Sequence, residues 1–411
     1  MLQAPATLPI RRNTLLLAAS LAANSATLQL NAAVASLTLV LVLDVEGLLG
    51  LGPAIVLASG AVVSLPAGRT MDRVGRIPVL AGGFLVGALG CGLAAVGSAT
   101  ESAPAVLGGL VGIGAASATA LLARTAAGDM YPPERRARGI ALVLFGAVFG
   151  AILGPAVFSP MLAGRDLDGD ALAPLWLAGG AFMLVALGLV CAVRPDPKRI
   201  AELMDPGGPV QTRPAAPLRE LLGRPGVIPA LIAAQASFAV MVAVMTLTGA
   251  VVVDHHHHAG HHVFPIIGAH VVGMYALVIV VGGAIDRIGR TAALAGGLLL
   301  MAVSAISLIW ITGVVVTAIA LFGLGLGWNF SFVAATAELA DCTAPWERGK
   351  LLGFNDLLAG ITGAGLALLG GVALSVVGVA ALAIGAAALV TLPAVWILRV
   401  GRPAELAARA A

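Results

Sequence analysis

The sequence predicts an all-α membrane protein in which twelve transmembrane helices form two six-helix bundles. Hydrophobic residues make up 59% of the 411 residues and charged residues only 10%, with a mean hydropathy of +1.02, a composition far from that of soluble domains. Apolar runs of roughly 20 residues, long enough to cross a bilayer as helices, recur along the chain, and a loop motif of the first half returns in the second. Because no phosphate-binding loop of the G-x-x-x-x-G-K type is present, neither an enzyme nor an ATP-driven pump is expected.

Twelve apolar runs can be placed in chain order, with polar or charged residues between them. The first six lie near residues 14–42, 47–67, 77–98, 103–126, 139–163 and 171–193. The second six lie near residues 227–252, 262–284, 291–311, 313–336, 351–374 and 376–398. We therefore expect an N-terminal six-helix bundle over 1–194, a cytoplasmic linker over 195–226 and a C-terminal six-helix bundle over 227–411. The proline-rich, charged linker suits a solvated segment with one short surface helix at Leu218–Leu222.

The basic residues predict the orientation, because Lys and Arg are retained on the cytoplasmic side of short loops. If both termini are cytoplasmic, 22 of the 23 Lys and Arg residues lie on the inner side, and Arg165 is the exception. We expect a multi-pass protein of the cell (inner) membrane, with the lipid bilayer as its surroundings and no nucleic acid as a partner. The alternative is that Arg11 and Arg12 begin a cleaved export signal, but the apolar run continues to Leu43 and its removal would leave eleven spans.

A nine-residue loop motif, G-x-x-x-D-R-x-G-R, follows both the second span and the eighth, with an offset of 214 residues between the copies. Its marked residues are Gly68, Asp72, Arg73 and Arg76 in the first copy, and Gly282, Asp286, Arg287 and Arg290 in the second. Another set, Asp129, Pro133 and Arg136, reappears at an offset of 212 as Asp341, Pro345 and Arg348. Retention of basic residues on one side explains the charges of the motif but not the fixed spacing of its Gly and Asp residues.

A doubled motif of this kind in a 6+6 helix chain resembles the major facilitator superfamily, and the resemblance covers essentially the whole chain. It implies the major facilitator fold, with two six-helix bundles around a midplane cavity and transport by rocking alternating access. It also implies a gating role for both motif copies. Asp72 would lie near the cytoplasmic start of the eleventh helix, the arginines would pair with nearby acids, and these contacts would hold the outward-facing state.

Candidate metal ligands gather around the loop between the seventh and eighth spans. Met241-x-x-x-Met245 precedes this loop and His270-x-x-x-Met274 follows it. If the two helices pack side by side, the helical rise places Met245 beside His270 and Met241 beside Met274. Thioether and imidazole ligands without carboxylate or cysteine favour Cu(I). The alternative is ordinary packing, since methionines at helical spacing usually fill a core, although a histidine inside a span is costly and is a candidate functional residue.

The loop itself holds six histidines, which would either collect metal ions at the mouth of the path or form only a solvated loop. They are His255, His256, His257, His258, His261 and His262. The methionine and histidine pairs resemble those of the CcoA-like copper importers within the superfamily. This resemblance implies copper uptake into the cytoplasm, with the copper ion as substrate, no resident cofactor and a possible cytoplasmic copper chaperone as a partner. We expect a monomer.

Other polar residues inside the spans leave a second function open. They are Asn24, Gln29 and Asn31 in the first span, Gln235 in the seventh, Asn329 in the tenth, and Asn355 and Asp356 in the eleventh. Such residues are candidates to line a cavity, and Asp356 is a candidate proton site, although it would also serve to cap or pair a helix start. The alternative to copper import is therefore a proton-coupled carrier or exporter of a small organic solute or drug.

Overall fold

The computed structural model describes residues 8–43, 51–162, 169–204, 216–250, 263–311 and 313–410, and within these ranges the regular structure is helical. The first half of the chain contains α1 (Ile10–Leu43), α2 (Leu51–Val74), α3 (Arg76–Ala99), α4 (Ala103–Leu121), α5 (Ala123–Met130), the short 3₁₀ helix η2 (Pro133–Arg135), α6 (Arg136–Leu144), α7 (Gly146–Leu162) and α8 (Gly169–Cys191). The all-α prediction is therefore confirmed for the described part of the chain.

The second half repeats this arrangement after two short linker helices, α9 (Pro197–Met204) and α10 (Leu218–Leu222). It contains α11 (Val227–Ala250), α12 (Val263–Tyr275), α13 (Val278–Ile288), α14 (Arg290–Ser307), α15 (Val314–Asp341) and α16 (Arg348–Ala410). Helix α16 is two helices that meet at Gly378, where φ is 74°. The short helix α10 has the bounds expected for the linker helix.

Nine helical stretches among the described residues are long and apolar enough to cross a membrane, and the bent pair formed by α12 and α13 makes a tenth. The two remaining expected spans coincide with α1 and with the limb of α16 that precedes Gly378. Many large apolar side chains point outward from these helices, for example Val62, Ile152 and Leu392, which are each about two-thirds exposed. Side chains of this kind are suited to contact with lipid.

Both motif copies end one helix and begin the next through a glycine with positive φ. Gly75 separates α2 from α3 with φ 104°, and Gly289 separates α13 from α14 with φ 91°. This left-handed region is open to glycine at little steric cost, so each motif copy turns the chain sharply and keeps its Asp and Arg side chains close together. Because Gly75 and Gly289 are 214 residues apart, the repeat in the sequence is also a repeat in backbone conformation.

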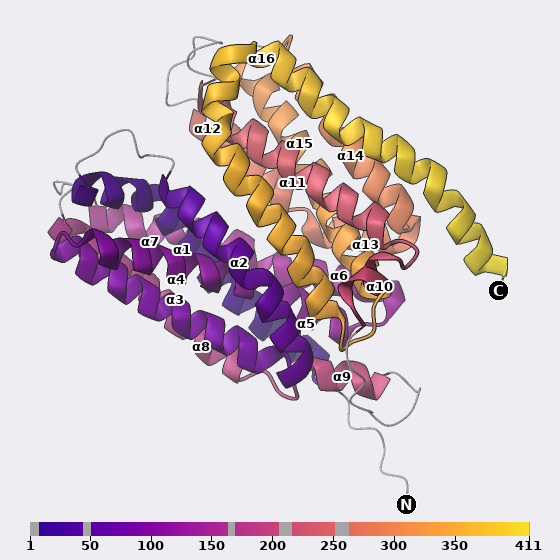
Figure 1. Cartoon of the computed structure of the whole chain (residues 1–411), viewed down its shortest axis with the longest axis horizontal. Helices are drawn as coiled ribbons and strands as arrows, with labels where there is room; N and C mark the ends of the chain where they lie inside the picture. The colour runs from indigo at the N-terminus through magenta and orange to yellow at the C-terminus, as the bar shows by residue number, and fades with distance from the viewer. Residues whose placement is uncertain are drawn as a thin grey trace, which may run out of the picture.

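The two halves lie against each other at one end of the molecule and diverge toward the other (Figure 1). We call the end that carries Asp72, Arg76, Asp286 and Arg290 the charged end. Helix α2 of the first half packs along α16 of the second, and α6 packs on α13. A continuous apolar core runs from one half into the other near the charged end. The halves are thus distinct bundles that share one interface.

Candidate transport site and gate

The first copy of the motif forms a buried ion-pair network. Arg76 Nε lies 2.6 Å from Asp129 Oδ2, and Arg76 Nη1 lies 2.8 Å from Asp72 Oδ1. Arg348, from the start of α16 in the other half, places its Nη1 2.6 Å from Asp129 Oδ1. Arg76 and Asp129 are both completely buried in side chain. Asp129 therefore joins one guanidinium from each half.

Asp72 also joins the two halves. It accepts hydrogen bonds from the backbone N–H groups of Gly349, at 2.9 Å, and Lys350, at 2.6 Å. These are free N–H groups in the first turn of α16, where a carboxylate is favoured by both hydrogen bonding and the helix dipole. Asp72 lies where the resemblance to the superfamily places it. The backbones approach so closely here that a Cβ on Gly68 would collide with the carbonyl group of Gly349.

The second copy of the motif makes the equivalent network. Asp286 accepts hydrogen bonds from the N–H groups of Ala137, at 3.3 Å, and Arg138, at 3.0 Å, in the first turn of α6. Arg290 lies 2.7 Å from Asp286 and 3.1 Å from Asp341. Asp341 in turn pairs with Arg136 of the first half. The remaining arginines of the two motifs, Arg73 and Arg287, are exposed.

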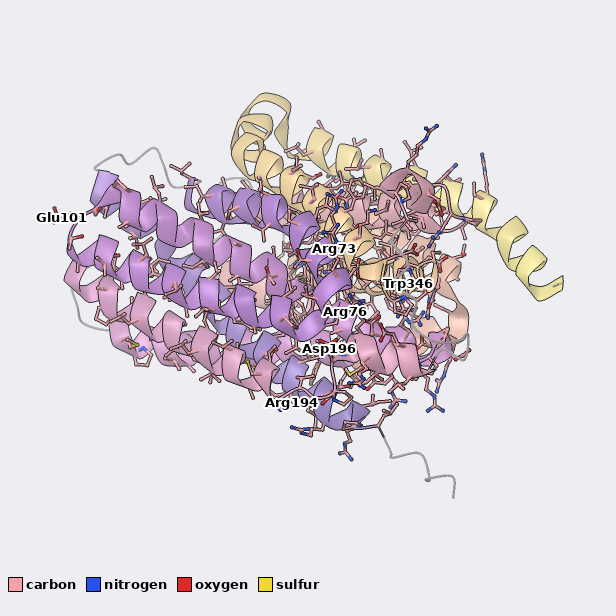
Figure 2. All side chains as sticks on the ribbon, turned by 60° about the horizontal axis from the view of Figure 1, so that its bottom comes forward. Arg73, Arg76, Glu101, Arg194, Asp196 and Trp346 are labelled. Atoms are coloured by element: carbon pink, nitrogen blue, oxygen red, sulfur yellow. The ribbon has the colours of Figure 1, made fainter. Side chains whose placement is uncertain are left out.

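Linker residues reinforce the charged end. Asp196 accepts hydrogen bonds from the N–H groups of Arg76, at 2.8 Å, and Ile77, at 2.9 Å, and so caps α3. Figure 2 shows Arg73, Arg76 and Asp196 together at this end, whereas Glu101 lies at the far end of the first half. The segment that the sequence predicts to be a solvated linker therefore begins in contact with the ion pairs of the charged end, which we call the gate.

A second linker contact ties α10 to the start of α16. Arg224 Nη1 lies 2.6 Å from Glu347 Oε2. Burial opposes ionisation of Glu347, but hydrogen bonds from Arg224 and from the backbone N–H groups of Ala216 and Ala344 outweigh it and lower its pKa below the usual 4.5. The Glu347 carboxylate is therefore charged at neutral pH and holds the linker against the second half.

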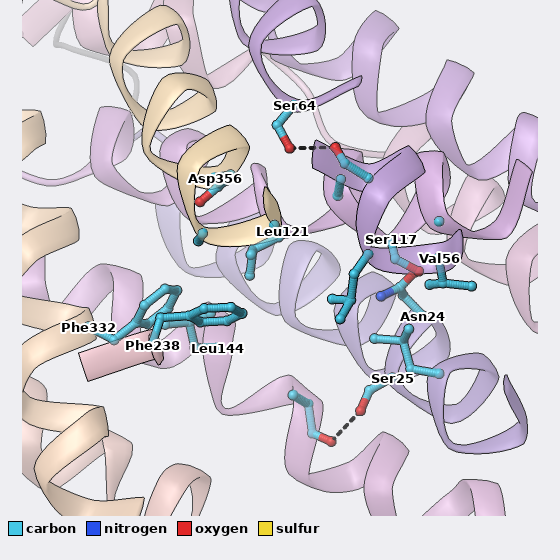
Figure 3. A pocket seen from close by; sticks show the side chains of 18 of the residues that line it. Asn24, Ser25, Val56, Ser64, Ser117, Leu121, Leu144, Phe238, Phe332 and Asp356 are labelled. Atoms are coloured by element: carbon cyan, nitrogen blue, oxygen red, sulfur yellow. Dashed lines mark hydrogen bonds between the residues drawn. The ribbon is translucent and has the colours of Figure 1, made fainter. Parts of the chain in front are cut away.

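A cavity of about 290 Å³ lies between the halves on the other side of this gate. The first half contributes mainly small and aliphatic residues, with four polar side chains from α1, α2 and α4: Asn24, Ser25, Ser64 and Ser117. The second half contributes most of the aromatic and sulfur-containing side chains: Phe238, Met241, Met274, Tyr275, Trp328 and Phe332, together with Asp356. Figure 3 shows Asn24 and Asp356 on opposite sides of this space.

The aromatic side chains form one ordered group. The rings of Trp328 and Phe332 stack with their centroids 4.6 Å apart and an angle of 12° between their planes. Tyr275 meets Trp328 edge to face, with the centroids 6.1 Å apart. These contacts, typical of aromatic pairs, fix the orientation of the indole ring and of its N–H group.

One charged residue, Asp356, lines the cavity in the described part of the chain, and it is bonded across the interface. Its Oδ1 accepts a hydrogen bond from Nη2 of Arg124, a fully buried side chain in the first turn of α5. Arg124 also lies over the ring of Phe332, with 4.9 Å between Cζ and the ring centroid. Asn355 donates to Asp356 at 3.3 Å, and Gln235 donates to the side chain of Asn355 at 3.0 Å. The expected polar cluster of α11 and α16 thus converges on one carboxylate.

The expected metal ligands are only partly brought together. Met241 and Met274 line the same cavity. His270 is buried against α15, where its Nδ1 lies 2.9 Å from the carbonyl oxygen of Leu321, and it is not among the cavity-lining residues. A carbonyl only accepts, so Nδ1 carries the proton, and Nε2 is buried without a hydrogen-bond partner.

Several predicted site residues cannot contribute to this geometry. The side chain of Met245 and the six histidines from His255 to His262 lie outside the described residues. Asn329 is buried on α15 and its amide has no hydrogen-bond partner, but it does not line the cavity. Within the described ranges, no three His, Cys, Asp or Glu side chains meet as a metal-binding group.

Reasoning from sequence missed several residues of the site, among them Arg124 and Tyr275. Arg124 was counted only among the basic residues that predict the orientation in the membrane. A basic residue inside the apolar run of 103–126 is, however, itself a signal of a functional site. Tyr275 follows Met274 directly but carried no motif. Its contact with Trp328 depends on the packing of α12 against α15, which the sequence does not reveal.

Two helical bundles around a shared cavity, joined by ion pairs at one end, define a membrane carrier of the alternating-access class. The sequence profile of the Major Facilitator Superfamily matches residues 14–337. The chain belongs to the Major Facilitator Superfamily and has its twelve-helix fold. It is a secondary transporter and not an enzyme.

Relatives with known names agree with this assignment. The chain is 31% identical to the uncharacterized MFS-type transporter YdeG of Bacillus subtilis, over 80% of this chain and 78% of that protein. It is 34% identical to the riboflavin transporter RfnT of Brucella anthropi, over 72% and 73% of the two chains. The crystal structure of the Escherichia coli fucose:proton symporter FucP superposes with a TM-score of 0.72 at 16% identity, over 93% of this chain and 98% of that one. These relatives do not support the CcoA-like copper subtype.

Proposed function

We propose that this transporter carries a small organic solute, which was the second of the two functions that the sequence left open. The observation that carries the proposal is the cavity itself, which is built from both halves and lined mainly by apolar and aromatic side chains with a few polar groups, as is usual for small-molecule sites. The gate of ion pairs closes this cavity at the charged end. Separation of the halves there, with closure at the opposite end, would move a bound solute across the membrane.

Asp356 is the proposed coupling site for protons. It is a buried carboxylate that lines the cavity and bonds to Arg124 of the other half. A proton that binds Asp356 would neutralise the carboxylate and weaken this bond between the halves, so that proton binding and rocking are linked. Asp356→Asn should then abolish accumulation driven by a proton gradient while solute exchange at equal concentrations on both sides continues.

We further propose the expected orientation, with the charged end and both termini on the cytoplasmic side of the cell inner membrane. The support is the concentration of basic residues at this end, which agrees with the retention of positive charge in the cytoplasm. In this orientation the present structure is closed toward the cytoplasm.

Copper import is the second candidate function, and one observation favours it. The thioether groups of Met241 and Met274 line the same cavity, and such ligands suit Cu(I). Two observations weigh against it: His270 faces α15, and burial together with nearby carboxylates raises the pKa of Cys342 to about 12, which keeps it a thiol at neutral pH. If copper is the substrate, the histidine loop would collect the ion and a cytoplasmic chaperone would receive it.

Uptake into proteoliposomes separates the two candidates. The full-length protein and Met241→Leu are each offered radiolabelled riboflavin and radiolabelled copper. Riboflavin is chosen because the Brucella relative is named a riboflavin transporter. We expect saturable uptake of an organic solute and little effect of Met241→Leu, because Met to Leu conserves volume and usually costs under about 1.5 kcal/mol. Copper accumulation that Met241→Leu removes would refute the organic-solute proposal.

A further inference from the structure

We propose that the cavity recognises a compact, uncharged, planar heterocycle whose ring edges carry both N–H donors and carbonyl or ring-nitrogen acceptors. This inference rests on the proposed function and names its substrate class. Nucleobase-like and pterin-like rings share the chemistry. Three unpartnered hydrogen-bonding atoms of residues that line the cavity, the charge of the cavity and its size carry the argument.

Three of the described cavity-lining residues have a buried polar side-chain atom without a partner. They are Oδ1 of Asn24 on the first half, and Nε1 of Trp328 and Oδ2 of Asp356 on the second. Leaving a buried donor or acceptor unpaired costs about 1–3 kcal/mol, so the great majority of such groups in proteins are paired. A ligand that pairs all three must accept one hydrogen bond and donate two, and it must reach both halves (Figure 3).

The serine hydroxyls of the cavity are already engaged. Ser25, Ser64 and Ser117 each donate to a backbone carbonyl oxygen of a helix, at 2.9, 2.7 and 2.9 Å. The serine oxygens can still accept, but a sugar presents several hydroxyl groups, each of which is both a donor and an acceptor, and the mainly apolar wall offers few groups to pair them. The site therefore favours a ligand with few polar groups on an apolar body.

The charge of the cavity disfavours a charged ligand. Asp356 is the one charged residue among the described lining residues, and the bond to Arg124 already balances it. A ligand with a full charge would enter an apolar space without a counter-charge, which is strongly unfavourable. A neutral ring does not meet this penalty.

The size and the walls favour a ring over a chain. A volume of about 290 Å³ is at the lower end of the range of roughly 300–1,000 Å³ for ligand pockets. The walls include the flat side chains of Phe238, Phe332 and Tyr275, and the indole of Trp328 is held by Phe332 on its face and Tyr275 at its edge. Its N–H group is thus a donor of fixed direction, which suits a rigid acceptor.

Direct binding to the full-length protein in lipid nanodiscs tests the proposal, with xanthine and pterin as probes. At least one should bind, and its ring N-methylated analogue, which lacks an N–H donor, should bind about tenfold more weakly, because an unpaired acceptor costs about 1.4 kcal/mol or more. Trp328→Phe keeps an aromatic ring beside Phe332 but removes the N–H group, and should weaken binding by a similar factor. Trp310→Phe is the matched control, since Trp310 is 73% exposed, and should change nothing.

Three results would overturn the inference: no binding of either ring, equal binding of the methylated analogue, or unchanged affinity in Trp328→Phe. The first two do not depend on the folding of a variant, because the rings and the analogue are tested on the unmodified protein. Uptake of a sugar without binding of any ring would refute the inference while the proposed function stands. Uptake of copper alone would refute both.

Discussion

The two copies of the gate network have the same connections but different environments. In each copy, one aspartate forms ion pairs with an arginine of its own half and an arginine of the other half. Asp129 pairs with Arg76 and Arg348. Asp341 pairs with Arg290 and Arg136. In each copy the motif aspartate also binds the first turn of a helix in the opposite half. The internal repeat of the sequence is therefore a repeated set of contacts between the halves.

Burial distinguishes the copies. Arg76 and Asp129 are 0% exposed, whereas Arg290 is 14% and Asp341 24% exposed in side chain. An ion pair near water is weakened by solvent and salt, while a buried charge that loses its partner is strongly unfavourable. The comparison indicates that the first copy contributes more to closure of the charged end, and paired substitutions test this difference.

The largest effect is expected at Asp129. Asp129→Asn leaves Arg348 without its carboxylate partner and Arg76 with Asp72 alone. Breaking a buried ion pair in this way costs about 3–5 kcal/mol and shifts the population away from the closed charged end on the order of a hundredfold or more. Distance distributions between spin labels at the exposed residues Glu134 and Arg219 report the opening. Asp341→Asn is the matched variant and should open the gate less. An equal response of the two variants would contradict the proposed asymmetry.

The motif aspartates should show the same order with a smaller difference. The N–H groups of Gly349 and Lys350 bond to different oxygens of Asp72, so Asp72→Asn keeps an acceptor for only one of them. It also removes the charge beside Arg76, a change of about 1.5–3 kcal/mol for a hydrogen bond to a charged group. Asp286→Asn should have a weaker effect on the same label distances. Solute affinity should be unchanged in both variants, since neither residue lines the cavity; an unaltered gate with altered affinity would refute this role.

Close backbone packing gives a third test. A methyl group at Gly68 would collide with the backbone carbonyl group of Gly349, which cannot move aside. At Gly282 the fit is less tight, since the nearest atoms are Cβ of Ala141 at 2.6 Å and the carbonyl oxygen of Ala137 at 2.9 Å. Overpacking costs about 1–3 kcal/mol, so Gly68→Ala should open the charged end more than Gly282→Ala. Gly82→Ala is the control, because no atom lies within 4 Å of its added carbon. Cross-linking yields across the charged end measure all three variants.

The smallest effect is expected from the linker pair. The pKa of Glu347 is lowered in the folded protein, so its ionised carboxylate stabilises the folded protein above pH 4.5. This stabilisation is lost as the pH falls through the pKa of Glu347 in the folded protein. Glu347→Gln should remove this part of the pH dependence of thermal unfolding. Glu220→Gln is the control, because Glu220 is mostly exposed and lies 3.8 Å from the same arginine. An identical pH profile in Glu347→Gln and the unmodified protein would exclude the linkage.

The sequence predicted the membrane fold and the gate better than the cavity, for physical reasons. Span length and hydropathy are local properties, and the repeat at an offset of 214 residues made the gate visible without coordinates. The cavity depends on which helices face each other. Helix α12 lies mainly against α15 and contacts α11 much less, so His270 is buried against α15, which spacing along the sequence does not reveal. Likewise, pairing of Arg124 with Asp356 joins residues 232 positions apart, which no spacing rule reveals.

The contact between Gly68 on α2 and Gly349 on α16 lowers the entropy cost of each transport cycle. Glycine has no side-chain rotamers, so the two helices can separate and return without any side chain at this point having to find its place again. When the halves close, only backbone atoms become ordered at this point of the interface. A contact of bulky side chains would lose rotamer freedom at every cycle, and the glycine contact avoids that loss in a protein that must repeat the motion for each molecule it carries.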